Sequence, residues 1–203
     1  MNNRSFSNIF RGDTFSKWRI GANVLTHDRT RAAIRELVEL ADRKSQLDKV
    51  LDCPCGAGRM VDLLLDWKVS VGDITPRRLE DVRKYFPDDD IDIHECDVFD
   101  LPFAENEFDL VLNCLLIQHI EKSRLSDLLT ELRRVTSKWI VATYPSSFSL
   151  VNVYRIFGRQ RQTRLTASEF QRLAEGAGLR IVAVRSVLPF IAAGKVVLLE
   201  KTG

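Results

Sequence analysis

The sequence lacks any long continuous apolar run, any internal repeat and any marked excess of charge. Residues 1–13 are polar and basic, without the apolar stretch that a signal peptide or a membrane-spanning helix requires, so cytoplasmic location is the default expectation. The net charge of +2 argues against a protein built mainly to coat nucleic acid. With 45% hydrophobic and 29% charged residues, the 203 residues predict one globular domain with its own core.

Cysteine is scarce as well, and the positions of the cysteines argue against disulfide bonds and against a metal site. The four cysteines lie in or beside predicted strand ends, where reduced thiols behave as small apolar groups: Cys53, Cys55, Cys96 and Cys114. A disulfide framework is not expected in a chain with this much core. Cys53 and Cys55 could form half of a metal site, but no matching Cys or His pair follows at zinc-site spacing. We therefore expect no metal ion.

Apolar residues recur with the alternating periods of helices and strands. Helical spacing covers residues 28–41, 58–65, 76–86, 125–132 and 170–175, the last preceded by a capping box at Thr166 and Glu169. Seven short apolar runs predict strands at residues 49–53, 69–74, 91–96, 108–116, 139–142, 180–188 and 194–199. This alternation predicts an α/β fold with a mostly parallel sheet. Because no helix separates the last two strands, one antiparallel strand is expected near the C-terminal edge.

The strongest functional signal is the glycine turn after the first predicted strand. Asp52 ends that strand, and Gly56 and Gly58 follow in a turn that lets backbone N–H groups approach a ligand. A carboxylate beside this turn would repel a dinucleotide pyrophosphate, whereas it suits the cationic amino group of an amino-acid-like ligand. The turn and the acid together therefore favour an amino-acid-like ligand over a dinucleotide.

Two more acids stand at the ends of the next two predicted strands. Asp73 ends the second, where an acid can accept hydrogen bonds from both hydroxyls of a ribose. Asp97 ends the third, where it could accept a hydrogen bond from an adenine amino group while Val98 packs on the ring. Each acid also has a plainer interpretation, since Asp52 and Asp73 could cap helices and Asp97 could be a solvated loop residue. Three acids at three successive strand ends favour one shared ligand.

From about Lys49 to Ile120 the sequence resembles the core of the class I S-adenosylmethionine (SAM)-dependent methyltransferases, of the group that acts on ubiquinone, sugars and lipids. The resemblance rests on the glycine turn, on residues 73–79 and on residues 96–120. It implies a Rossmann-like, doubly wound sheet of seven strands, with SAM as cofactor and S-adenosylhomocysteine (SAH) as product. The cofactor contacts that it implies are Asp52, Cys55, Gly56 and Gly58 at the methionine end, Asp73 at the ribose, Asp97 and Val98 at the adenine, and Asn113 and Cys114 beside the sulfonium; Ile74, directly after Asp73, is also counted as a cofactor contact.

Two residues within this region need separate comment. Pro54 stands where the family has the first glycine of the turn, and proline fixes φ and has no N–H. We therefore expect the donors to come from Gly56 onward. His119 lies in the segment that the resemblance places beside the transferred methyl group, where an imidazole could deprotonate a hydroxyl or an amine. A lone histidine is as often structural. His119 is therefore the candidate catalytic residue, and a purely structural role stays open as the alternative.

We expect a single domain of residues 1–203. Segments of this domain outside the core that resembles the family would determine which acceptor binds. Residues 1–45 are expected to form an N-terminal cap and helix, and residues 146–165 a substrate-side insertion. Within the insertion, residues 147–164 interleave apolar groups with arginines. This segment could meet an anionic membrane or a protein partner, or pack on the sheet with solvated arginines. Nucleic acid is not the expected partner, because Asn113 to Leu116 lack the Asn/Asp-Pro-Pro-aromatic pattern of adenine-amino methyltransferases.

We therefore expect methyl transfer to O or N of a small-molecule, sugar or lipid-linked acceptor, in the cytoplasm or at the inner face of a membrane. Two alternatives stay open. One is a non-catalytic subunit with a methyltransferase fold, serving a larger assembly. The other is an NAD-dependent oxidoreductase, which shares the glycine turn and the acid at Asp73. Asp52, the missing third glycine and the segment at Asp97 argue against the second alternative.

Overall fold

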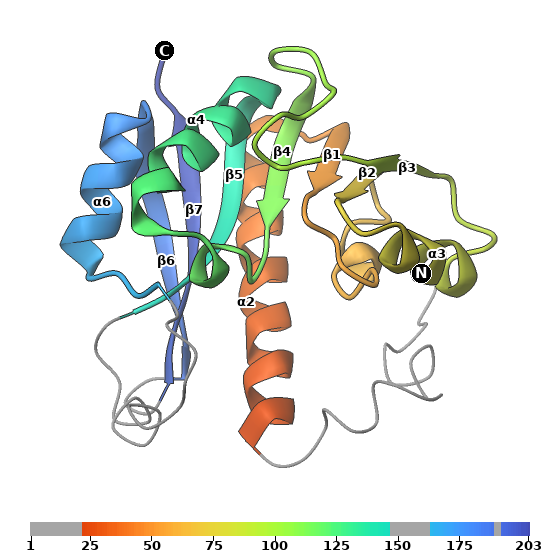
Figure 1. Cartoon of the computed structure of the whole chain (residues 1–203), viewed down its shortest axis with the longest axis horizontal. Coiled ribbons are helices and arrows are strands. Elements are labelled where there is room, and N and C mark those ends of the chain that lie inside the picture. The colour runs from red at the N-terminus through yellow and green to blue at the C-terminus, as the bar shows by residue number, and fades with distance from the viewer. Residues whose placement is uncertain (1–21, 147–162, 189–191) are drawn as a thin grey trace.

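The computed structural model describes residues 22–146, 163–188 and 192–203, which fold around one seven-stranded sheet (Figure 1). The strand order is β3-β2-β1-β4-β5-β7-β6. The strands are β1 (Lys49–Asp52), β2 (Lys68–Asp73), β3 (Ile91–Glu95), β4 (Phe108–Asn113), β5 (Thr136–Pro145), β6 (Leu179–Leu188) and β7 (Ala192–Lys201). Strands β1 to β5 pair in parallel, and β7 runs antiparallel to both β5 and β6. The predicted class, a doubly wound and mostly parallel sheet with one antiparallel strand near the C-terminal edge, is confirmed.

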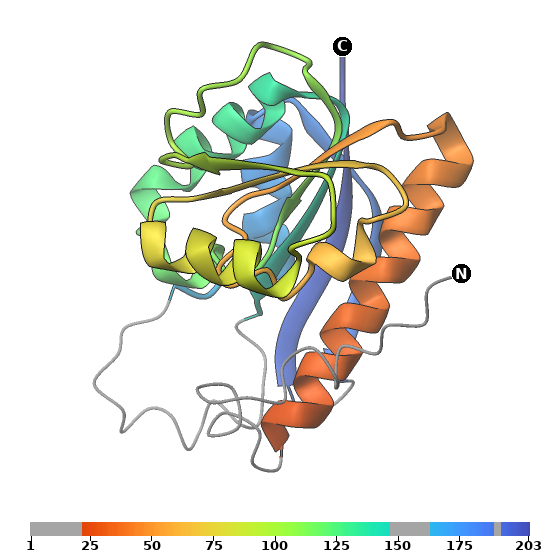
Figure 2. The ribbon, with the colours of Figure 1, turned by 90° about the vertical axis from the view of Figure 1, so that its right-hand side faces the viewer.

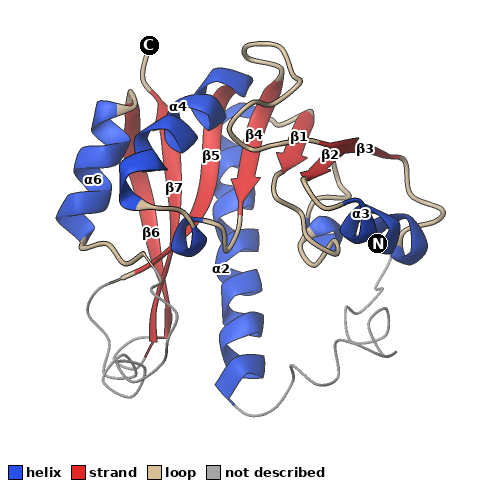
Figure 3. Cartoon of the chain, in the orientation of Figure 1, coloured by secondary structure: helices blue, strands red, loops and turns tan. Residues whose placement is uncertain are grey.

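Helices cover both faces of the sheet and give it two separate cores (Figure 3). The α-helices are α2 (Ala22–Ser45), α3 (Pro76–Tyr85), α4 (Leu125–Val135) and α6 (Ala167–Gly176), and the short 3-10 helices are η2 (Val61–Leu63), η3 (Ile117–His119) and η4 (Lys122–Arg124). Buried residues of α2, η2 and α3 form the core on one face, and those of α4 and α6 the core on the other. Figure 2 shows α2 and α4 on opposite sides of the sheet. No helix in the described part of the chain is long and apolar enough to cross a membrane.

Helix α2 extends beyond the predicted residues 28–41 at both ends. Its inner face is buried against the sheet through Ile34, Leu37, Val38 and Ala41. Near its C-terminal end, Ser45 Oγ accepts a hydrogen bond of 2.7 Å from Trp139 Nε1 of β5. Near its N-terminal end, Arg31 forms an ion pair with Asp62 at 2.5 Å, with both side chains largely buried. The helix is therefore fixed against the sheet at one end and against the segment that follows β1 at the other.

The predicted helix over residues 58–65 is wrong, because this segment forms turns and the short helix η2. Gly58 has a φ of +77°, outside the right-handed helical region. The backbone bonds that follow span three residues, as between the Leu64 N–H and the Val61 carbonyl at 2.9 Å. The Arg59 carbonyl, which an α-helix would use internally, instead accepts a hydrogen bond from Arg31. A residue 28 positions earlier in the chain thus takes part in setting this conformation.

The ends of the predicted insertion lie next to each other, whereas most of it falls outside the described residues. Ser146 and Leu165 form a parallel bridge, and the Leu165 N–H donates to the Pro145 carbonyl at 3.1 Å. The chain therefore leaves β5 and returns to it at one place. The expected membrane or partner surface falls mainly on residues 147–162, and the expected N-terminal cap on residues 1–21, all outside the described residues.

Candidate active site

Buried polar side chains end three neighbouring strands of the sheet. Asp52 ends β1, Asp73 ends β2 and Asn113 ends β4, and their exposed fractions are 1%, 1% and 0%. Strand β1 lies between β2 and β4 and is parallel to both, so these three ends meet at one edge of the sheet (the lower edge in Figure 1). Ligands of open α/β sheets bind outside the carboxyl ends of the strands. The structure thus brings these three predicted site residues to the expected edge.

The glycine turn is bonded to the neighbouring strand β2. The Cys55 N–H donates to the Gly72 carbonyl at 2.8 Å, and the Gly56 N–H donates to Asp73 Oδ2 at 3.0 Å. Gly56 has a φ of +56°, and a Cβ atom built on it would meet nothing within 4 Å. The turn therefore combines a left-handed backbone with open space at Gly56, which is what close approach of a ligand to the backbone requires.

Asp52 is a buried carboxylate whose two oxygens have no hydrogen-bond partner in the described part of the chain. Burial, and next the negative charge of Asp73, raise the pKa of Asp52 well above its ordinary value. Asn113 donates from Nδ2 to the Cys53 carbonyl at 2.8 Å, while its Oδ1 has no partner among the described residues. Buried acceptors without donors are rare and costly. A ligand with an ammonium group fits them, because it would supply up to three donors and one positive charge.

The acid at the end of β2 already accepts backbone hydrogen bonds. Besides Gly56, the Thr75 N–H donates to Asp73, reaching Oδ1 at 2.9 Å, and Arg78 Nη1 lies 3.5 Å from Oδ2. Each carboxylate oxygen has two lone pairs, so both retain capacity to accept a hydroxyl group. Ile74, directly after Asp73, is 64% exposed. An exposed apolar side chain beside a polar strand end suits the flat face of a nucleoside.

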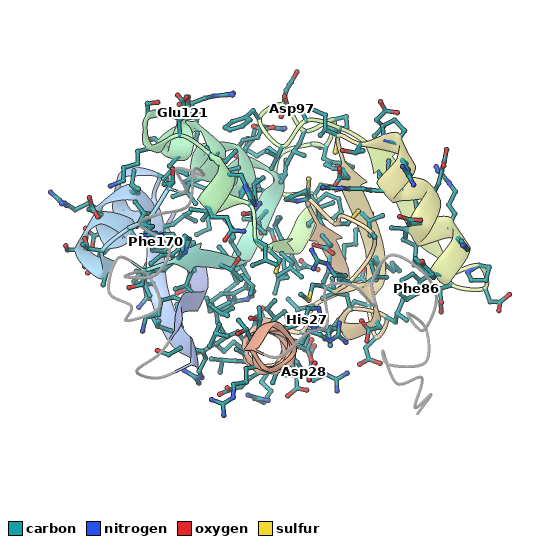
Figure 4. All side chains as sticks on the ribbon, turned by 60° about the horizontal axis from the view of Figure 1, so that its bottom comes forward. His27, Asp28, Phe86, Asp97, Glu121 and Phe170 are labelled. Atoms are coloured by element: carbon teal, nitrogen blue, oxygen red, sulfur yellow. The ribbon has the colours of Figure 1, made fainter. Side chains whose placement is uncertain are left out.

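The end of β3 contributes the residues predicted to contact adenine. Asp97 is exposed, and its Oδ1 accepts a hydrogen bond of 3.0 Å from the Phe99 N–H. Val98 is buried, with 9% of its surface exposed. Figure 4 shows Asp97 at the outer surface of the molecule. Asp97 is therefore open to a ligand, whereas Val98 belongs to the core, and their contact with adenine stays a prediction.

Two thiols near this edge, Cys55 and Cys114, have raised pKa values. Burial, and next the charge of Asp52, raise the pKa of Cys55, and the same two causes raise the pKa of Cys114 to about 12. A protonated thiol is a poor nucleophile, so neither group is suited to covalent catalysis. Leu115, directly after Cys114, has a φ of +58°, is 37% exposed and donates its N–H to Thr143 Oγ1 at 2.6 Å. These residues shape the end of β4 and supply apolar contact surface.

His119, the candidate catalytic residue, lies in η3 with its side chain exposed. Its ring nitrogen Nε2 is 3.1 Å from the side-chain amide nitrogen of Gln118. Its backbone N–H donates to the Leu116 carbonyl at 2.8 Å. Gln118 in turn accepts a backbone hydrogen bond from Thr163, at the end of the insertion. The structure therefore places His119 at the surface rather than among the buried acids, and its catalytic role stays a hypothesis.

The sequence analysis missed two residues: Arg59, whose charge interacts with Asp52, and His27, which interacts with Arg59. Arg59 follows the glycine turn directly, and its charge interacts with Asp52. His27 lies near the start of α2; burial, and next the charges of Arg59 and Arg31, lower its pKa. Figure 4 shows His27 on the side of α2 that faces the sheet and Asp28 on the outer side. The position of Arg59 after Gly58 was visible in the sequence, whereas nothing local marks His27.

Comparison with known proteins gives a family for the segment that holds this site. Residues 50–138 match the family model described as a methyltransferase domain. Comparison with curated proteins found no match. Among solved structures, the magnesium protoporphyrin IX methyltransferase of Synechocystis PCC 6803 with bound SAH is similar, with a TM-score of 0.76, 13% identity, and coverage of 98% of this chain and 96% of that chain.

A second similar structure is the 1,6-didemethyltoxoflavin-N1-methyltransferase of Burkholderia thailandensis, with bound 1,6-didemethyltoxoflavin and SAH. It has a TM-score of 0.67 and 19% identity, and the match covers 98% of this chain and 89% of that chain. At these identities the solved structures establish the fold, while the family match covers β1, the glycine turn and the ends of β2, β3 and β4. Residues 50–138 therefore match a methyltransferase domain, and the chain has the fold of the class I SAM-dependent methyltransferases.

Proposed function

We propose that the chain transfers a methyl group from SAM to an oxygen or nitrogen atom of a small-molecule acceptor, either free or part of a sugar or lipid. The observation that carries the proposal is the pair of buried acceptors, Asp52 and Asn113, beside the open space at Gly56. The ammonium group of a methionine moiety supplies the donors that these atoms need. Two similar methyltransferases, named for a porphyrin and for a toxoflavin precursor, support a small acceptor.

The contribution of the chain is to position the reactants and to exclude water. When bound, SAM supplies both the methyl group and the leaving group. Asp52 and Asn113 would hold the amino end, Asp73 the ribose hydroxyls, and Ile74 the face of the base. Leu115 would offer an apolar contact near the reacting atoms. Holding two reactants in line lowers the barrier by several kcal/mol, on the order of 7–11 in well-oriented cases, without covalent help from the protein.

A general base is needed only if the acceptor atom is a hydroxyl or a protonated amine. His119 is the proposed base, because η3 begins four residues after the end of β4, the strand end that carries Asn113. His119→Gln should then lower kcat with such an acceptor by about 10²-fold or more and leave the affinity for SAH unchanged. An unchanged kcat would remove His119 from the mechanism.

Calorimetric titration of the purified chain with SAM, SAH and NAD tests the proposed cofactor. We expect saturable binding of the two sulfur compounds and none of NAD. Asp52→Asn keeps the shape of the side chain but removes its charge, and should weaken SAH binding by about tenfold or more. The matched control is Asp66→Asn, an exposed acid beyond η2, which should bind as the wild type does. Binding of NAD would favour an oxidoreductase, and no binding of any of the three would favour a non-catalytic subunit.

The proposed location is the cytoplasm, with peripheral contact to an anionic membrane through residues 147–164. Support comes from the sequence, in which arginines alternate with apolar groups over this segment. Co-sedimentation with vesicles that contain or lack phosphatidylserine tests the proposal. Binding to the anionic vesicles alone is expected, and a chain that stays in the supernatant with both would exclude membrane contact.

A further inference from the structure

Two cysteine side chains, Cys53 and Cys96, meet over a glycine of β2. Cys53 directly follows β1 and Cys96 directly follows β3, so one cysteine lies on each side of β2. A Cβ atom built on Gly72 would lie 3.2 Å from Cys53 Sγ and 2.6 Å from Cys96 Sγ. Both sulfur atoms are therefore within 3.2 Å of one point, which stays open because residue 72 has no side chain.

The two thiols interact directly with each other. A hydrogen bond between them is the main cause that lowers the pKa of Cys96 and raises the pKa of Cys53. Both residues are free and buried, in the core on the face of the sheet that α4 and α6 cover. The other two cysteines, Cys55 and Cys114, belong to the core on the opposite face. The fold thus makes one contacting pair out of four cysteines.

This pair is too wide for a disulfide, but it suits an ion between the two sulfur atoms. With β2 between them, the backbones of Cys53 and Cys96 are two strand spacings apart, roughly 9–10 Å. A disulfide needs Cα atoms within about 7 Å of each other. A metal–thiolate bond is about 2.3 Å long, so an ion in line between two thiolates holds the sulfur atoms about 4.6 Å apart. Such an ion can therefore bridge the pair without movement of the strands.

The ligand set selects the kind of ion. The described part of the chain holds no group of three or more Cys, His, Asp or Glu side chains that could bind a metal ion, so a four-ligand Zn²⁺ site is not expected there. Soft thiolate ligands favour Cu⁺, which accepts two ligands in line. The sequence analysis expected no metal ion because it considered spacing along the chain, whereas Cys53 and Cys96 come together only on folding.

We propose that Cys53 and Cys96 form a two-thiolate binding site for Cu⁺. Binding forms two Cu–S bonds and releases both thiol protons to solvent, so the bound unit carries one negative charge. Each ligand adjoins an acid at a strand end, since Cys53 follows Asp52 and Cys96 precedes Asp97. The bound ion is thus joined through the backbone to two positions proposed to contact the cofactor. The inference itself does not depend on the use of SAM.

Anaerobic titration of the full chain with Cu⁺, in competition with the chromogenic chelator bicinchoninate, tests the site. We expect one Cu⁺ per chain, and Cys53→Ala and Cys96→Ala should each weaken the affinity at least about 100-fold. The matched control is the double variant Cys55→Ala, Cys114→Ala, which keeps only the proposed pair and should bind Cu⁺ as the wild type does. Gly72→Ala keeps all four thiols but fills the point between the two sulfur atoms, and should also lose binding.

Several outcomes would overturn the inference. A wild type that leaves Cu⁺ with the chelator would do so, as would binding that survives in Cys53→Ala or Cys96→Ala, or that a folded control variant loses. X-ray absorption of the copper-loaded wild type needs no variant and should show two sulfur neighbours. A third sulfur, or a nitrogen or oxygen ligand, would contradict the two-thiolate site. Thermal unfolding without copper shows whether each variant folds.

Discussion

Gly56 donates its backbone N–H to Asp73 Oδ2 at 3.0 Å, and this bond joins the turn after β1 to the end of β2. The carboxylate proposed to hold the ribose therefore also supports the turn proposed to receive the methionine end. Asp52, at the end of the adjoining strand, accepts no such bond within the described residues. The two buried acids thus differ in role. Asp73 holds the turn in place through backbone hydrogen bonds, whereas the unpaired Asp52 lowers the stability of the protein until a ligand supplies donors.

Asp52→Asn should stabilise the ligand-free protein at neutral pH. Burial and the charge of Asp73 raise the pKa of Asp52 in the folded state, so the unfolded chain releases this proton at a lower pH, near the ordinary value of 3.8. The associated stability is present below that pH and is lost as the pH rises through the folded pKa. Urea unfolding should show Asp52→Asn matching the wild type at pH 3.5 and exceeding it by about 1 kcal/mol or more at pH 8. A variant less stable than the wild type at pH 8 would contradict the unpaired state of Asp52.

Alanine at the two glycines of the turn should have different effects. Gly58 has a φ of +77°, and an added Cβ would lie 3.1 Å from Phe86 and 3.2 Å from Val82. Gly58→Ala should therefore cost about 2 kcal/mol or more of stability, from backbone strain and crowding. Gly56→Ala meets no atom within 4 Å, so only the backbone cost of about 1 kcal/mol is expected. Its methyl group should instead weaken SAH binding; thermal unfolding and calorimetry on both variants separate the effects.

Gly72→Ala should destabilise the protein through the two thiols that lie over it. A Cβ at Gly72 would lie 2.6 Å from Cys96 Sγ and 3.2 Å from Cys53 Sγ. Both cysteines are buried, so neither thiol has free space to move into. We expect a loss of about 2 kcal/mol or more. In a double-mutant cycle, Cys96→Ala should recover about 1 kcal/mol of this loss, and strict additivity of the two changes would show that Cys96 is not the obstacle.

The capping box of α6 should stabilise the protein at neutral pH, and this stabilisation should be lost in acid. Glu169 accepts the Thr166 N–H at 2.7 Å, and this backbone bond, followed by the bond to Lys122, lowers the pKa of Glu169 to about 2. A depressed pKa contributes stability above the unfolded value, and this stability is lost as the pH falls from about 4.5 to 2. In Glu169→Gln, the free energy of unfolding should change less with pH over that interval than it does in the wild type. Thr166→Ala should cost about 1 kcal/mol at pH 7, where an unchanged free energy of unfolding would argue against the cap.

The polar residues at the strand ends could be predicted from the sequence, because the carboxyl ends of parallel strands lie at the same edge of a sheet. Asp52, Asp73 and Asn113 each follow an apolar run, and knowing the direction of the strands was sufficient to bring them together. The conformation of residues 58–65 was not predictable in this way, since apolar spacing indicates a helix while the Arg59 carbonyl bonds to Arg31. Contacts across 28 positions leave no local pattern. Arg59 was missed for the same reason, because its relation to Asp52 exists only after the turn has folded.

The bridge between Ser146 and Leu165 has a consequence for the length of the segment that it closes. Because the chain leaves and rejoins β5 at one point, the intervening stretch can be lengthened, shortened or replaced without altering the register of the sheet. Closing a longer loop between fixed ends costs little, about 0.6 kcal/mol for each doubling of its length. A segment of a different length between Ser146 and Leu165 should therefore leave unchanged the strand ends that are proposed to hold the methyl donor.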